Sequence, residues 1–256
     1  MSVFLSCRHE INPYPYRRRM DALTALTETP VAQFNLDRTR HAAPQIFEHL
    51  RELIISMSLT PGTVLSRTDL AAQYNISQTP VRDALIRLSE EGLVDVYPQH
   101  ATVVSRIDVN LAQEAHFLRL SVEMEIARTL AASVDASLIE RLRKLVSRQK
   151  AALEEKDLSG FTLADQAFHR RMYEAAKVPH LYALVRRHSG HLDRLRSLHL
   201  PAPGKAAAVL ADHDAIVDAI AKGDTALAEQ SVRRHLSGTL ANVEEIRSRH
   251  RDYLKN

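Results

Sequence analysis

Residues 59–96 read LTPGTVLSRTDLAAQYNISQTPVRDALIRLSEEGLVDV. Pro61-Gly62 breaks the chain, residues 68–74 have the pattern of a short helix, and residues 75–77 form a tight turn before a third helix. Ser77 is well placed to cap that helix, and Pro80 falls in its first turn, where a missing N–H costs little. Two helices joined by a tight turn are typical of a helix-turn-helix.

The flanking residues extend this unit on both sides. A helix begins near Gln45, because apolar residues recur there at the spacing of one helix face. After Gly92, residues 93–97 and 101–104 are two runs rich in β-branched residues on either side of Pro98-Gln99-His100, which predicts a hairpin. Three helices followed by a hairpin form a winged helix-turn-helix.

From Asp108 onward every segment has helical periodicity. The breaks between segments predict six helices, near residues 109–132, 136–156, 160–176, 179–199, 205–221 and 224–250. We therefore expect a mostly α protein with three parts: a flexible arm over residues 1–40, a winged helix-turn-helix over 41–107, and a six-helix antiparallel bundle over 108–256. The bundle would serve effector binding, metal binding and dimerisation.

Composition excludes several classes of protein. The chain has 256 residues, of which 45% are hydrophobic and only 7 are Gly, which argues against a glycine-rich nucleotide-binding fold. No stretch approaches the roughly 20 apolar residues of a membrane helix, and the N-terminus does not have the pattern of a signal peptide. The single cysteine, Cys7, cannot form an intrachain disulfide, so we expect a cytoplasmic protein with no membrane partner.

A helix-turn-helix reads double-stranded DNA by placing its second helix in the major groove. Gln78 and Arg82 lie one helical turn apart, and their side chains can pair with adenine and guanine respectively. Residues 45–107 carry five Arg and seven acidic residues, so DNA binding depends on where each Arg lies rather than on net charge. The candidate DNA-contacting residues are Arg67, Thr68, Ser77, Gln78, Thr79, Arg82 and His100.

The same stretch closely resembles the DNA-binding domain of GntR-family bacterial transcription regulators. The Pro-Gly turn, the Leu-Ala pair of the second helix, Ser-x-Thr-Pro-Val-Arg and Glu-Gly-Leu-Val all match. In that family an Arg usually stands at the positions of Thr68 and Gln78, and a Gly often occupies the wing tip, where Ala101 follows His100. The resemblance therefore implies a different operator from those of the relatives, with Arg82 as the retained base reader.

Four residues of the helical half have the spacing of a metal site. Asp165 and His169 lie i, i+4 on one helix, so their side chains point the same way. His213 lies ten residues before Gly223 and His235 twelve after it, which places the two imidazoles level across an antiparallel helix pair. Three imidazoles and one carboxylate suit Zn, the metal that we favour, or Ni, Mn or Fe.

The helical half also resembles the ligand-binding (FCD) domain of the FadR subfamily, in its VanR-like branch. The Asp-Gln-Ala-Phe-His segment, His213 and His235 occur in the expected order, and Arg119-Leu-Ser-Val-Glu123 resembles the opening helix of that domain. The resemblance implies that the four residues hold the ion and that Arg119 faces the same cavity and takes a carboxylate. Arg194 is a second candidate for effector binding, and Arg196 a third.

Three interpretations follow from these patterns. The first is a transcription regulator that binds a palindromic operator as a homodimer and responds to a small carboxylate effector. The resemblance implies that it acts as a repressor, which is the commoner behaviour of that family. The second is a metal-dependent hydrolase with the bundle as catalytic domain, although no Glu or His is placed by spacing as a general base. The third is a helical scaffold in which the His cluster is structural.

Overall fold

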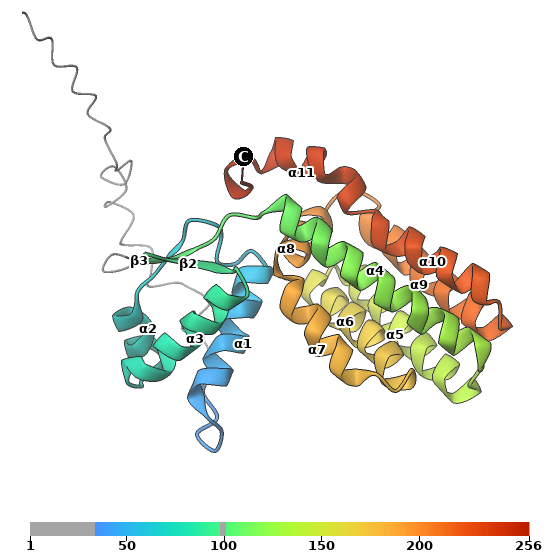
Figure 1. The fold of residues 1–256 in the computed structure, drawn as a ribbon, viewed down its shortest axis with the longest axis horizontal. Coiled ribbons are helices and arrows are strands. Elements are labelled where there is room, and N and C mark those ends of the chain that lie inside the picture. The colour runs from blue at the N-terminus through green and yellow to red at the C-terminus, as the bar shows by residue number, and fades with distance from the viewer. Residues whose placement is uncertain (1–33, 98–100, 256) are drawn as a thin grey trace, which may run out of the picture.

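The computed structural model describes residues 34–97 and 101–255. The chain forms a small winged domain followed by a larger helical domain, with the two in direct contact (Figure 1). The elements of the first domain are α1 (Ala42–Ile55), β1 (Val64–Leu65), α2 (Arg67–Tyr74), α3 (Gln78–Glu90), β2 (Val94–Tyr97) and β3 (Ala101–Val104). Those of the second are α4 (Val109–Ala132), α5 (Ala136–Glu154), α6 (Leu158–Ala175), α7 (Pro179–His188), α8 (Gly190–His199), α9 (Lys205–Lys222), α10 (Thr225–Ser237), η4 (Leu240–Asn242), α11 (Val243–Arg249) and η5 (Arg251–Tyr253).

The winged helix-turn-helix is confirmed. The turn between α2 and α3 begins at Asn75, whose left-handed backbone (φ 53°) ends α2 and redirects the chain. The predicted hairpin is β2 and β3, and a third strand, β1, which was not expected, pairs with β3 to give the sheet order β1-β3-β2. Apolar residues of α1 and α3, such as Leu50 and Leu88, close the core under this sheet.

Two details of the first domain differ from expectation. Residues 34–40 are not a free arm, because Phe34 stacks on His49 at 4.2 Å and the side-chain amide of Gln45 accepts a hydrogen bond from the Asp37 N–H. The rest of the predicted arm falls on residues 1–33 and lies outside the described residues. Ser77 occupies the N-cap position of α3, but its side chain makes no capping hydrogen bond.

The second domain is all-helical within the described residues, as expected, but two of the six predicted helices are divided. The segment 179–199 breaks between α7 and α8 at Ser189, whose hydroxyl donates to the Val185 carbonyl and whose carbonyl accepts from the Asp193 N–H. The segment 224–250 ends its first helix at Ser237 and continues as η4 and α11. After the first break, His191 and Arg194 of α8 contact the segment between the domains.

The helices of the second domain enclose one large apolar core. The long helix α4 lies along α9 and α10, and α5, α6 and α7 cover the other side (Figure 1). Residues such as Ile126, Leu142, Phe168 and Ile216 fill the space between them. In the described part of the chain, no helix has the length and apolarity required to cross a lipid bilayer.

The segment that joins the two domains is held by α8 and by the C-terminal residues. The Ser105 carbonyl accepts from Arg194 of α8, and the Asp108 N–H donates to His191 Nδ1 at 3.0 Å. The C-terminal residues return to this segment, where Ile107 pairs with Leu254 in a parallel bridge. These contacts connect α8 directly to the residues that follow β3.

Candidate metal and effector site

The four predicted metal ligands meet in the core of the helical domain. Asp165 and His169 come from α6, His213 from α9 and His235 from α10, and all four side chains are buried. One ligand atom from each lies within 4.8 Å of the others. His235 Nε2 lies 3.2 Å from both His169 Nε2 and His213 Nε2, and Asp165 Oδ1 lies 3.6 Å from His213 Nε2.

The separations of the histidine nitrogens fit a transition-metal ion. With metal–nitrogen bonds of about 2.1 Å, two adjacent ligand nitrogens are about 3.0 Å apart around an octahedral ion and about 3.4 Å apart around a tetrahedral one. The observed 3.2 Å separations lie between these values. Asp165 Oδ1 is buried and has no hydrogen-bond partner in the described chain, so it is available as the oxygen ligand. The cluster could therefore hold a metal ion.

Residues behind two of the histidines orient their rings. His213 Nδ1 lies 2.7 Å from Gln149 Oε1, and the ring of His213 stacks on Phe168. His169 Nδ1 lies 2.8 Å from Glu123 Oε2, an ion-pair contact whose alignment falls short of a hydrogen bond. Because both oxygens accept, they favour a proton on Nδ1 and leave the Nε2 lone pairs directed at the cluster centre.

The electrostatics keep these groups in their ligand forms. Burial lowers the pKa of His213 to about 3, and burial together with His213 holds the pKa of His235 well below its usual value. Burial would raise the pKa of Asp165, but Arg196 and the neighbouring histidines outweigh it and keep that pKa well below the usual range. Neutral imidazoles and an ionised carboxylate are the states that bind a cation.

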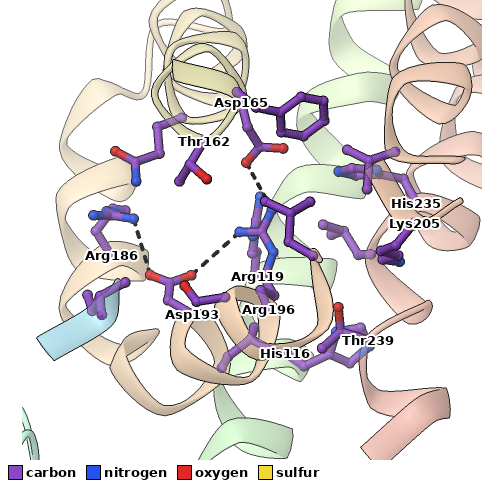
Figure 2. Close-up of a pocket in the computed structure, with 18 residues that line it drawn as sticks. His116, Arg119, Thr162, Asp165, Arg186, Asp193, Arg196, Lys205, His235 and Thr239 are labelled. Carbon is purple, nitrogen blue, oxygen red and sulfur yellow. Dashed lines mark hydrogen bonds and ion pairs between the residues drawn. The ribbon is translucent and has the colours of Figure 1, made fainter. Parts of the chain in front are cut away.

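A cavity of about 60 Å³ opens beside the cluster and is lined by Asp165 and His235. The predicted effector residue Arg119 lines it from α4, and Arg196 lines it from α8 (Figure 2). Arg119 is buried and pairs through Nε with Glu123 Oε1 at 2.7 Å. The cavity therefore combines a candidate metal site with guanidinium groups, the two features that bind small carboxylates.

The prediction for Arg194 is wrong. Arg194 is fully buried, but it does not line the cavity. Its guanidinium donates to the Ser105 carbonyl at 2.6 Å and lies 2.8 Å from His191 Nδ1, so it fastens α8 to the segment between the domains. Positions 194 and 196 lie about 200° apart around a helix, which is why one faces the interface and the other the cavity.

An ion-pair chain leads from the cavity toward the first domain. Arg196 contacts Asp165 at 2.9 Å and Asp193 at 3.5 Å, and Asp193 also pairs with Arg186 at 3.1 Å. Figure 2 shows Asp193 between the two arginines. The Arg186 carbonyl accepts a hydrogen bond of 2.6 Å from Arg51 of α1.

Arg51 completes the connection to the predicted recognition helix. Its Nε contacts Glu91 Oε2 at 2.8 Å, and Glu91 is the C-cap residue of α3. The last residue of α1, Ile55, lines the cavity itself. A change in the cavity therefore has a physical route to both α1 and α3.

The DNA-contacting candidates lie together at the start of α3 and the start of α2. Gln78 and Arg82 are exposed on α3, and the amide of Gln78 donates to Thr68 Oγ1 at 3.4 Å across the turn. Arg67, Ser77 and Thr79 are exposed on the same edge, which leaves this surface open to a partner. His100 lies outside the described residues.

The residues that support the metal ligands and Arg196 were not predicted from the sequence. Glu123 stands in the sequence only as part of a motif, Gln149 was not assigned a role, and Arg186 and Asp193 carry no sequence signal. A polar residue at an otherwise apolar helix position, such as Gln149 between Val146 and Ala152, is a detectable signal, because such a residue is buried only with a partner.

The fold and site define the class of protein: a DNA-binding regulator in which a winged helix-turn-helix domain is joined to an all-helical domain that contains a candidate metal cluster. The family model for bacterial regulatory proteins of the gntR family matches residues 42–104, and the FCD domain model matches residues 114–238. FCD domains often bind metal. The chain belongs to the GntR family of transcription regulators.

Proteins with similar sequences include other transcription regulators. An uncharacterised HTH-type regulator from an unstable DNA locus of Streptomyces ambofaciens is 36% identical over 203 residues, which cover 79% of this chain and 85% of that protein. The transcriptional repressor RspR of Escherichia coli is 28% identical, over 85% of this chain and 96% of its own. The gluconate operon repressor of Bacillus subtilis is 24% identical, over 77% and 83%.

Solved structures share the fold. Escherichia coli McbR/YncC matches with a TM-score of 0.69 at 18% identity, over 82% of this chain and 99% of that one. A GntR regulator from Rhodococcus sp. RHA1 matches with a TM-score of 0.66 at 23% identity, over 79% and 97%. These relatives and neighbours are transcription regulators rather than enzymes, and the alternative of a hydrolase finds no support among them.

Proposed function

We propose that this protein is a repressor whose affinity for a palindromic operator is controlled by a small organic acid. The acid binds in the cavity beside the Asp165, His169, His213 and His235 cluster, which holds zinc. The observation that carries the proposal is the composition of the cavity wall: Arg119 and Arg196 of the helical domain and Ile55 of the DNA-binding domain line the same space.

DNA recognition is assigned to the exposed edge of the first domain. Gln78 and Arg82 would contact base edges, while Arg67, Thr68, Ser77 and Thr79 would contact phosphates. Two copies of the chain would present two recognition helices to the half-sites of one operator, which is why the proposal includes a homodimer.

Control follows from the contacts around Arg196. A bound zinc ion would supply a Lewis-acidic position for a ligand carboxylate. A ligand carboxylate in the cavity would compete with Asp193 and Asp165 for the guanidinium of Arg196, because the side-chain carboxylates and the ligand accept from the same N–H donors. Loss of that pairing would let α8, which carries Asp193, shift relative to α7, whose residue Arg186 pairs with Asp193 and accepts from Arg51 through its backbone carbonyl, so ligand binding would favour a different arrangement of the domains.

The test begins with DNA selected from a random duplex pool by the purified full chain. Affinity for that DNA is then measured by fluorescence anisotropy with zinc and each of a panel of organic acids. A loss of at least about fivefold in affinity with one acid is the expected coupling. An affinity that no acid of the panel changes would overturn the proposal.

Variants separate the metal cluster from the rest of the molecule. The double substitution His169→Ala with His213→Ala should abolish zinc binding by elemental analysis and blunt the response to the acid, while dimer size and DNA affinity without ligand persist. The matched control is His180→Ala with His188→Ala, since both of these histidines are exposed on α7. Equal zinc content in the two double variants would contradict the assigned ligands.

A further inference from the structure

Lys205 is the lysine that lines the cavity. It is the first residue of α9, and its side chain is half-buried. Figure 2 shows Lys205 beside His235 on one side of the cavity, with Arg186 and Asp193 on the opposite side. The cavity therefore has cationic side chains at both of its ends.

The cations differ in their partners. Each of the three lining arginines has a carboxylate, in the pairs Arg119–Glu123, Arg186–Asp193 and Arg196–Asp165. In contrast, no carboxylate of the described residues lies within 4.0 Å of Lys205 Nζ. The nearby Asp212 is engaged by Arg234 at 2.8 Å. Lys205 is thus the lining cation, within the described chain, whose charge is not matched.

The surroundings of Lys205 show the cost of that unmatched charge. Burial lowers the pKa of Lys205, and Arg196 lowers it further, because neither favours a second positive charge in the cavity. The ammonium group reaches its place over Gly238, where a Cβ atom would approach Nζ to 2.8 Å. An anion in the cavity would supply the missing partner for this ammonium group.

We propose that Lys205 is a second anchoring point for the effector, and that the effector is a short dicarboxylate. This rests on the proposed function, in which one carboxylate binds at the arginine and metal-cluster side, and it adds a second carboxylate at Lys205. The size of the cavity, about 60 Å³, favours a short aliphatic chain over an aromatic acid or a sugar acid, since pockets for larger ligands hold 300 Å³ or more.

The test compares acids that differ by one carboxylate. Isothermal titration of the zinc-supplemented full chain uses malonate against propionate, succinate against butyrate and glutarate against valerate, with gluconate as the sugar acid. At least one dicarboxylate should bind about tenfold or more tightly than its partner monoacid and than gluconate. A monoacid or gluconate that binds as tightly as every dicarboxylate would overturn the inference while leaving an effector site in place.

Two variants test Lys205 itself. Lys205→Met removes the charge, whereas Gly238→Ala keeps the charge and displaces the flexible end of the lysine, and Gly238 has an ordinary helical backbone that tolerates alanine. Both should bring the dicarboxylate affinity down to about that of the monoacid and leave the monoacid affinity unchanged. Lys222→Met, at the exposed far end of α9, is the matched control and should bind as the unsubstituted chain does.

The outcomes are distinguishable. If no acid of either series binds, both the proposed function and this inference fail. If dicarboxylates bind tightly but Lys205→Met and Lys222→Met behave alike, the assignment of Lys205 fails and the effector site stands. If Lys205→Met weakens monoacids and dicarboxylates equally, Lys205 supports the cavity rather than anchoring a second carboxylate, and the inference is overturned.

Discussion

Glu123 lies behind the candidate metal site, and the substitution Glu123→Gln tests what this buried carboxylate contributes to stability and to metal binding. The side chain is 3% exposed and contacts both Arg119 and His169. Glu123→Gln keeps the shape of the side chain but removes its charge. The buried guanidinium of Arg119 then loses its carboxylate, and because the amide has one accepting oxygen in place of two, it can accept from Arg119 or from His169 Nδ1 but not from both.

The expected loss of stability follows from the pKa of Glu123. Burial raises this pKa, but Arg119 and His169 outweigh burial and bring it to about 2, against an ordinary value of 4.5. The difference corresponds to about 3 kcal/mol of stabilisation of the charged form. Removal of one partner from a buried ion pair costs about 3–5 kcal/mol in general, which agrees. We therefore expect Glu123→Gln to lower the free energy of unfolding by about 3 kcal/mol.

Urea unfolding followed by circular dichroism, with a chelator present, measures this loss without any contribution from metal. Glu125→Gln is the matched control on the same helix, because its ion pair with Arg128 is largely exposed and should contribute less than about 1 kcal/mol. Zinc affinity is measured separately by competition with a chelating dye. It should fall about 10- to 100-fold in Glu123→Gln, as for other residues that orient a ligand histidine.

The dependence on pH provides a second check. Because the folded-state pKa of Glu123 is depressed, its contribution is fully present above about pH 4.5 and is lost as pH falls toward about 2. The difference between the variant and the unsubstituted chain should shrink over that window. Equal stability of Glu123→Gln and Glu125→Gln at neutral pH would refute the reasoning.

Three further substitutions test other parts of the molecule. Arg82→Ala should weaken binding to the selected DNA by about 1–3 kcal/mol, and unchanged anisotropy titrations would exclude it as a base reader. Arg51→Met should diminish the effect of the acid on DNA affinity more than Arg187→Met, whose interdomain ion pair is exposed, and an equal response would disprove the route through α1. Burial, with Arg194, lowers the pKa of His191 to about 3. Below about pH 6.5 the unfolded chain therefore binds a proton that the folded chain excludes, and the free energy of unfolding falls by up to about 1.4 kcal/mol for each unit by which pH decreases. His191→Asn keeps an acceptor and should show a flatter decline in urea midpoints, whereas parallel declines would contradict this role.

Local pattern was sufficient for much of this protein. The winged helix-turn-helix could be predicted because its signals are short-range. They are the turn at Asn75, the apolar spacing of α1 and α3, and the β-branched runs of the wing. Regular helix geometry also predicted the cluster. Asp165 and His169 have i, i+4 spacing, and His213 and His235 lie at similar distances from the turn that joins their helices. A repeat of 1.5 Å per residue can be extrapolated along a helix, and the four ligands do meet.

The tertiary structure alone decided which polar residues support the cluster and how the domains connect. Arg194 and Arg196 differ by two positions, yet one holds Ser105 and the other holds Asp165, because a break at Ser189 sets the rotation of α8. Gln149 acquires its role only when α5 packs beside α9. Contacts between residues far apart in the sequence depend on the packing of whole helices, and the rotation of each helix about its axis decides which neighbour a side chain meets. For that reason the ligands could be predicted from spacing, whereas their supporting residues and the route to the recognition helix could not.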